Sequence, residues 1–172
     1  HGIVASEPVS RPRHILALYE KIGPAFVEKL NGWFSGVLID LSVKRAWLFN
    51  DRYGLSRVYH HTAEGGFYFA SEAKALLAVL PPTRALDMRS AAEAYVCGSP
   101  LQGRTLFERI VQLPGAALWT MAAGRPLLRD SYFSRSAWEN QPPMSEPEFH
   151  ASLEETFKRV LPRYFQGSEA IG

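Results

Sequence analysis

The stretch Leu30-Asn31-Gly32-Trp33-Phe34-Ser35-Gly36 stands directly before an apolar run that ends at Asp40. Because residues 33–40 are almost continuously apolar, they predict a strand buried on both faces. The side chains expected in the core are Trp33, Phe34, Val37, Leu38 and Ile39. Asn31-Gly32 is typical of a turn, here between a preceding helix and this strand.

A second block, Asn50-Asp51-Arg52-Tyr53-Gly54, ends the return strand 46–50 and predicts a hairpin followed by a sharp break. An Asp and an Arg beside a glycine turn can hold a carboxylate or a phosphate. In the structural interpretation, Asp51 caps the turn backbone, Gly54 takes a positive φ and Arg52 tethers the loop. The structural interpretation is favoured.

A third block, Phe69-Ala70-Ser71-Glu72-Ala73-Lys74-Ala75-Leu76-Leu77, predicts a strand that runs into a helix over 72–80. Ser71-Glu72 is read as a helix N-cap followed by a carboxylate at the favourable end of the helix dipole. An acid/base pair is the less favoured alternative. Lys74 stands too close to Glu72 in sequence for the two to face each other on one helix surface.

The rest of the chain alternates hairpins and helices. Helices are expected from a cap at Ser10 to residue 22, over 24–30, from a cap at Asp87 to Cys97, and from Ser145 onward. Further strands are expected at 58–62, 67–70, 106–110, 117–121 and 127–128. This order predicts an α+β fold in which stacked antiparallel sheets are covered by helices.

The proline-containing segment 134–145 lacks apolar periodicity and is expected to be a linker. The helix after it carries one apolar face, made by Phe149, Leu153, Phe157, Val160 and Leu161. Such a face needs a partner. It is expected to pack back on the fold, to form a homodimer, or to fray.

Taken together, the three blocks resemble the glutaminase domain of asparagine synthetase, a class II (Ntn-type) glutamine amidotransferase. Tyr59, five residues after Gly54, fits the same pattern, as do Gly103–Phe107, Leu113-Pro114-Gly115 and Tyr132-Phe133. The resemblance implies a partial Ntn-hydrolase αββα sandwich. It makes residues 1–133 the C-terminal portion of the amidotransferase domain, and 146–172 the first helix and lead-in of an ATP-dependent synthetase domain.

In that family the nucleophile is an N-terminal cysteine whose own α-amine is the base. This sequence begins with His1 and carries one cysteine, Cys97, so it is expected to be an internal fragment with no catalytic or substrate-binding residue of its own. The partners implied are an N-terminal glutaminase segment and a C-terminal synthetase domain. ATP and magnesium are implied for the full-length parent. No cofactor is expected for this chain, which lacks a glycine-rich phosphate loop.

One departure from the family pattern favours a second hypothesis. The family carries Ser-Asp-Thr-Glu before the first helix, and its Asp binds the amino group of glutamine; here the stretch is Ser10-Arg11-Pro12-Arg13. An Arg at that position would repel the substrate ammonium group. The alternative is therefore a non-catalytic scaffold or interaction domain, as in relatives such as β-lactam synthetases and lasso-peptide cyclases.

Composition narrows the remaining possibilities. The 172 residues have a net charge of +2 with both signs interspersed, which does not favour nucleic acid binding. No apolar run reaches the length of a membrane span. A single cysteine fits the reducing cytoplasm, and Cys97 is expected to be a buried structural thiol. His60 and His61 should point to opposite faces of a strand, so no metal site is predicted.

Overall fold

The computed structural model describes residues 11–63, 65–80 and 84–163. The chain divides into two compact units, residues 1–134 and residues 135–172. Ser10, the expected cap of the first helix, lies outside the described residues.

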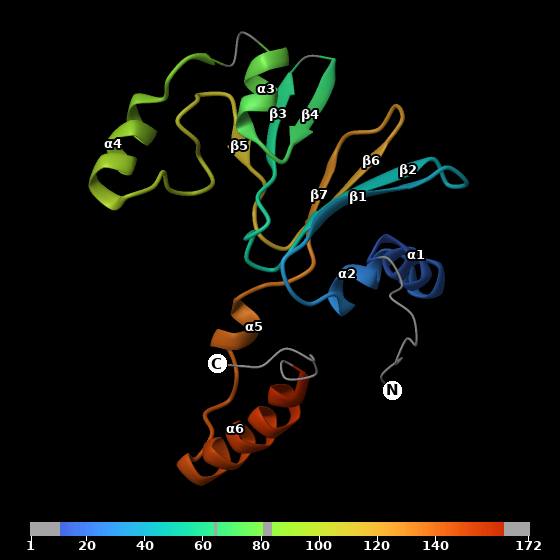
Figure 1. The fold of residues 1–172 in the computed structure, drawn as a ribbon, viewed down its shortest axis with the longest axis vertical. Coiled ribbons are helices and arrows are strands. Elements are labelled where there is room, and N and C mark those ends of the chain that lie inside the picture. Colours follow the sequence, from blue (N-terminus) through green and yellow to red (C-terminus); the bar gives the residue numbers. More distant parts are fainter. Residues whose placement is uncertain (1–10, 64, 81–83, 164–172) are drawn as a thin grey trace, which may run out of the picture. The chain divides into compact units, whose positions relative to one another are not determined.

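The first unit contains short helices and two antiparallel sheets (Figure 1). Its helical elements are α1 (Arg11–Ile22), η1 (Gly23–Ala25), α2 (Phe26–Lys29), α3 (Ala73–Val79) and α4 (Met88–Cys97). Its strands are β1 (Ser35–Asp40), β2 (Arg45–Asn50), β3 (Tyr59–Ala63), β4 (Gly66–Ala70), β5 (Val111–Gln112), β6 (Ala117–Ala122) and β7 (Leu128–Ser131).

The larger sheet has the order β1-β2-β6-β7. The predicted hairpin is confirmed, because β1 pairs with β2 in the register Leu38↔Trp47 and Gly36↔Phe49. β6, which comes much later in the sequence, pairs with the other side of β2. β1 and β7 are the edge strands.

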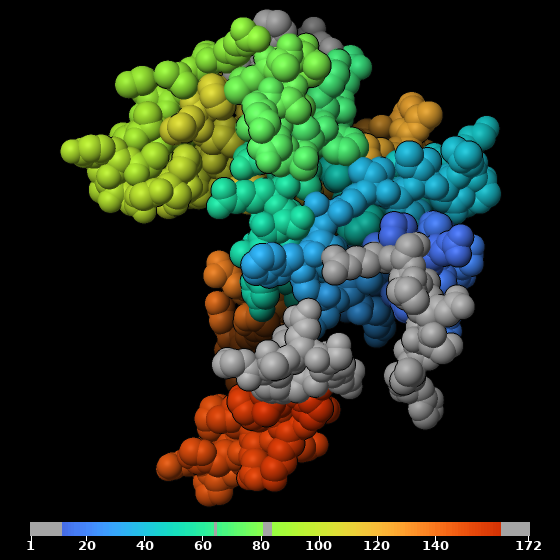
Figure 2. Space-filling view, in the orientation of Figure 1, coloured from blue at the N-terminus to red at the C-terminus, as the bar shows by residue number. Residues whose placement is uncertain are grey.

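Helices α1 and α2 cover one face of this sheet, and Figure 2 shows them directly against the β1–β2 hairpin. Alternate residues of a strand share a face, so Leu38, Trp47 and Phe49 all reach the same layer as Phe26. Phe26 and Phe49 meet edge to face, with ring centroids 5.1 Å apart. A Cβ on Gly36 would lie 2.9 Å from the Phe49 ring, so this strand position accepts a glycine best.

The opposite face of the larger sheet packs on the smaller sheet, whose order is β4-β3-β5. Leu48 and Trp119 from the larger sheet share a buried cluster with Val58 and Leu113, and Phe67 of β4 packs against it. The Phe67 and Trp119 ring centroids are 5.8 Å apart. The fold is therefore α+β, with two stacked antiparallel sheets flanked by helices, as in an Ntn-like sandwich.

The expectation that the first strand is buried on both faces is wrong. Leu38 is buried, but Trp33 is 80% exposed, Ile39 64% and Val37 39%, while Phe34 is half-buried. β1 is an edge strand, and among the described residues only its helix-facing side is fully covered. Trp33 precedes the strand and lies in a loop.

The strand expected at 106–110 is also replaced by turns. The Thr105 hydroxyl accepts from Phe107 N–H at 3.1 Å and donates to the Ile110 carbonyl at 2.7 Å, which curls the backbone. Only an isolated bridge, Leu86↔Phe107, forms there. The strand begins afterwards, at Val111.

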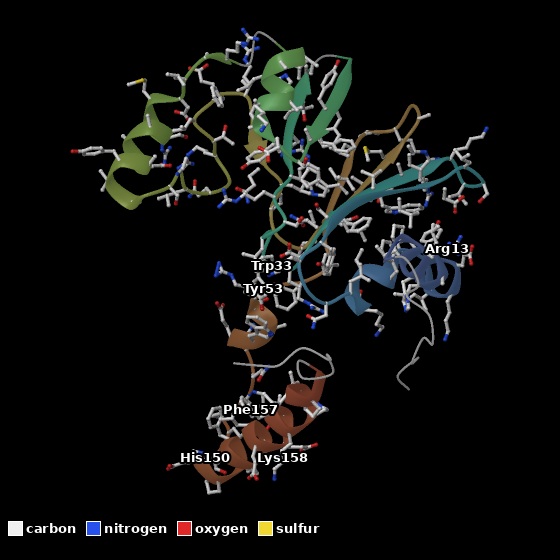
Figure 3. The ribbon with its side chains drawn as sticks, viewed as in Figure 1. Arg13, Trp33, Tyr53, His150, Phe157 and Lys158 are labelled. Carbon is white, nitrogen blue, oxygen red and sulfur yellow. The ribbon has the colours of Figure 1, made fainter. Side chains whose placement is uncertain are left out.

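The second unit holds α5 (Ser136–Glu139), α6 (Glu146–Val160) and η3 (Leu161–Arg163). Glu148 accepts hydrogen bonds from the backbone N–H and the hydroxyl of Ser145, which fixes the start of α6. Phe149, Leu153 and Phe157 on its apolar face are each at least half exposed, and Figure 3 shows Phe157 projecting from the helix. Among the described residues, no helix has the length and apolar character that crossing a membrane requires.

Candidate functional site

The Asp51 carboxylate organises the turn that follows β2. It is 2% exposed, and it accepts from the backbone N–H groups of Tyr53 (3.1 Å), Leu55 (3.1 Å) and Ser56 (2.7 Å). The Asp51 main-chain carbonyl accepts from Gly54 and Ala116. With both carboxylate oxygens directed at backbone donors, Asp51 caps the turn rather than facing an open surface.

Arg52 is directed toward the end of α2. Its guanidinium donates to the carbonyls of Glu28 at 3.0 Å and Leu30 at 3.4 Å, and it lies 6.0 Å from the centroid of the Phe133 ring. These contacts tie the turn to the segment before β1. Asp51 and Arg52 therefore have different partners and do not converge on one ligand position.

Gly54 has the positive φ expected of it, 66°. A second glycine, Gly115, approaches this turn so closely that a Cβ there would lie 2.8 Å from the Arg52 carbonyl oxygen. The Pro114-Gly115 turn and the Asp51–Gly54 turn are thus packed backbone to backbone.

Sequence reasoning missed two residues of this junction, Asn50 and Tyr132, as candidates. Asn50 is fully buried, donates to the Pro114 carbonyl at 2.9 Å and accepts from Ala117 N–H at 2.9 Å. Tyr132 donates to the Asn50 carbonyl at 2.8 Å. Burial raises the pKa of Tyr132 to about 12, so it remains a donor at neutral pH. A polar residue at the end of an otherwise apolar strand was the available signal for Asn50.

Asn31 and Gly32 lie in the loop between α2 and β1, where Gly32 has φ 104°. This loop is adjacent to the Asp51 turn, since Asp51 N–H donates to the Phe34 carbonyl at 2.8 Å. Exposed Trp33 and Tyr53 come from these two neighbouring segments (Figure 3). A cavity of about 400 Å³ opens between the loop and the first turns of α1, lined by His14, Ile15, Leu30, Asn31, Gly32, Trp33 and Phe34.

Tyr59, Ser71, Glu72 and Lys74 do not join this cluster. Tyr59 begins β3 and lines a different cavity, next to Ala73. The prediction that Ser71 caps α3 is wrong: the cap position is Glu72, and no side-chain cap hydrogen bond forms. Extended backbone continues through Glu72, so the helix starts later than its sequence pattern suggests. Lys74 is exposed.

Cys97 is exposed, which corrects the expectation of a buried thiol. It is the last residue of α4, just before the left-handed cap Gly98, and a terminal turn leaves its side chain uncovered. The described residues contain no cluster of three or more His, Cys, Asp or Glu that would hold a metal ion.

The two histidines of β3 do face opposite sides of their sheet. His60 lies against Trp119, with ring centroids 4.9 Å apart, whereas His61 stacks on Tyr68. Both rings are buried. His60 therefore belongs to the space between the sheets, and His61 to the side of the smaller sheet that faces away from it.

Two antiparallel sheets flanked by helices are consistent with the Ntn-like sandwich class of fold. Residues 10–133 match the family model described as a glutamine amidotransferase domain, and the chain belongs to this family. Family membership supports glutamine-dependent amide transfer in general. The comparison with curated proteins found no match.

Proposed function

We propose that this chain is part of an asparagine synthetase-like enzyme, which transfers the amide nitrogen of glutamine to aspartate with ATP and magnesium. In this proposal residues 1–133 are the scaffold of the glutaminase domain. An N-terminal segment supplies the cysteine nucleophile, and a C-terminal synthetase domain, entered through residues 146–172, supplies the ATP site. The enzyme is proposed to act in the cytoplasm.

The cavity beside Asn31 and Gly32 is the observation that carries this proposal. Its volume of about 400 Å³ is sufficient for an amino acid, and it is open at the first turns of α1. The resemblance assigns recognition of the glutamine amino group to residues 10–13, immediately before His14 of the cavity wall. A substrate-sized space thus lies next to the segment expected to select the substrate.

Arg11 supports a second candidate, a non-catalytic scaffold domain. It occupies the position at which the family has an Asp that binds the ammonium group of glutamine. Two like charges 4 Å apart repel by about 1 kcal/mol in water and by about 4 kcal/mol in a partly desolvated site. That penalty would weaken glutamine binding by roughly fivefold to nearly a thousandfold.

The discriminating experiment uses the complete gene product with glutamine labelled with ¹⁵N at the amide, aspartate, ATP and magnesium. Labelled asparagine supports the enzyme. Arg11→Asp should raise glutaminase activity, while the matched control Arg13→Asp makes the same charge change at an exposed position of α1 and should not (Figure 3). A folded protein that releases no glutamate, with or without Arg11→Asp, supports the scaffold alternative instead.

The 172-residue chain provides a separate control. Its one cysteine, Cys97, is exposed at the end of α4 and is not proposed as a nucleophile, so these residues alone should not hydrolyse glutamine. Glutamate release that Cys97→Ser abolishes would contradict this assignment.

A further inference from the structure

The outer edge of β1 has no neighbouring strand among the described residues, because the larger sheet has the order β1-β2-β6-β7. The two edges of this sheet differ in chemistry. β7 carries Arg129 and Asp130, and charged side chains are a common means of preventing an edge from pairing with another strand. β1 has no proline and no charged residue before Asp40. The edge of β1 is therefore an unprotected place for one more strand.

The exposure of the side chains of β1 points the same way. Val37 pairs with Leu48 across the sheet, so the two side chains share a face. Leu48 is 1% exposed, whereas Val37 is 39% and Ile39 64% exposed. The buried apolar layer on this face thus stops at β2. Within the described part of the chain, the apolar row of β1 has a neighbour on one side only.

The chain enters α1 close to the start of β1. His14 and Ile15 line the same cavity as Phe34, which directly precedes β1. Further along α1, the Tyr19 hydroxyl donates to the carboxylate of Asp40, at the end of β1, at 2.6 Å. α1 therefore follows β1 in the same direction, and Figure 1 shows it beside the β1–β2 hairpin. A segment that leads into α1 and lies along β1 must run antiparallel to β1, like the other pairings of this sheet.

The length of chain before α1 fits this path. Because β1 has six residues, a strand that pairs with all of it also needs six. The stretch Gly2-Ile3-Val4-Ala5-Ser6-Glu7 has that length, and its β-branched residues favour a strand. Pro8 has no N–H and would end the pairing. Residues 8–10, if extended, span about 10 Å, which is about the distance between two packed layers.

We propose that residues 2–7 are the missing neighbour of β1 and pair antiparallel with its outer edge. Glu7 and Pro8 would then protect the end of the new edge, as charged residues and prolines do in other sheets. Because β1 follows directly on the loop that lines the cavity of about 400 Å³, this pairing would also hold residues 10–13 beside that cavity. This last step alone rests on the function proposed above.

Amide hydrogen exchange of the full 172-residue chain, resolved by NMR, tests the pairing without glutamine or catalysis. In an edge strand, alternate amides point away from the sheet and exchange quickly, whereas in an interior strand the amides on both sides are hydrogen-bonded. We expect the outward amides of β1 to exchange at least about tenfold more slowly than the outward amides of β7, the other edge of the same sheet. Equally fast exchange at both edges would overturn the proposal.

Nuclear Overhauser contacts identify what occupies the edge. Contacts between the Hα atoms of residues 3–6 and those of residues 36–39 are expected, because these atoms lie close together in an antiparallel pair. A sample that mixes isotope-labelled and unlabelled chains separates contacts within one molecule from contacts between two. Contacts between β1 and a second copy of the chain, or protection of β1 with no contact to residues 2–7, would refute this occupant.

Two neighbouring proline substitutions test the segment directly. Successive residues of a strand direct their N–H groups to opposite sides, so only one of Val4 and Ala5 donates to β1. Proline is tolerated where the N–H faces away from the sheet. At least one of Val4→Pro and Ala5→Pro should therefore restore fast exchange to the outward amides of β1, and the other serves as its matched control. Slow exchange in both variants would show that residues 2–7 do not cover this edge.

Discussion

Replacement of Asp51 by alanine should be among the most damaging single changes in the first unit. The carboxylate is 2% exposed and accepts three backbone hydrogen bonds, from Tyr53, Leu55 and Ser56. Alanine removes both oxygens while the three N–H groups stay in place. These donors would then have to be satisfied by water that enters a closely packed turn.

The magnitude follows from the number of donors left without a partner. Each buried donor that loses its acceptor costs about 1–3 kcal/mol. Leu55 and Tyr53 are exposed residues whose N–H groups can recruit water, so the sum falls near 4 kcal/mol rather than at its upper limit. Asp51→Asn keeps one acceptor oxygen but loses the charge and the Ser56 bond, and should cost about 1–2 kcal/mol.

Urea unfolding followed by tryptophan fluorescence would measure these costs, because Trp47 and Trp119 are both buried in the first unit. Asp130→Ala, at an exposed position of β7, is the control and should change the unfolding free energy by less than about 0.5 kcal/mol. If Asp51→Ala matched this control, or if Asp51→Asn were as damaging as Asp51→Ala, the carboxylate would not be acting as a backbone cap. Loss of activity without loss of stability would instead make Asp51 a functional residue.

Three further perturbations test separate parts of the fold. The folded state lowers the pKa of His60 to about 4, so the contribution of His60 to stability is complete above pH 6.5 and is lost as pH falls toward 4. Allowing for solvent screening, the loss should be about 2 kcal/mol. In urea unfolding, His60→Phe should flatten the decline in unfolding free energy that the wild-type protein shows between pH 7 and 5. Because Leu38 is buried and Val37 is not, Leu38→Asp should cost about 3–5 kcal/mol of stability and Val37→Asp less than about 1 kcal/mol. Equal melting temperatures for the two variants would contradict the edge-strand arrangement. Because the apolar face of α6 is half exposed, its amide hydrogens should exchange faster than those of β2 and β6. Equal protection in a proven monomer would show that α6 belongs to the core of the first unit.

Local sequence signals predicted most of the elements. Gly23 ends α1, Gly98 caps α4 in the left-handed conformation, and Asp87 accepts from the first N–H groups of α4, all as expected. Such signals depend on a few neighbouring residues, so they can be read from sequence. The apolar run before Asp40 was misread because its burial depends on which strands lie beside it. A run typical of a central strand forms an edge strand here.

The candidate sites were less predictable for the same reason. The roles of Asp51, Arg52 and Gly54 in the turn follow from local chemistry. The contribution of Gly115 depends on two turns about sixty residues apart in sequence meeting backbone to backbone. A cavity lined by His60, Arg109 and Arg129 combines β3, the segment before β5, and β7. No spacing rule brings these residues together, because they are joined only by the stacking of two sheets.

The Asn50–Asp51 junction lies on both connections between the two sheets. Asn50 ends β2. Its side-chain amide forms hydrogen bonds with Pro114 and Ala117, which lie on the connection from β5 to β6. Asp51 holds Ser56, on the path from β2 to β3. Both crossings between the sheets are therefore fixed at this junction. Asp51→Asn should therefore loosen the packing of the two sheets, and we expect faster amide hydrogen exchange in β3 although the substitution touches no residue of that strand. Unaltered exchange in Asp51→Asn would mean that the packing of Trp119 and Phe67 alone sets the distance between the sheets.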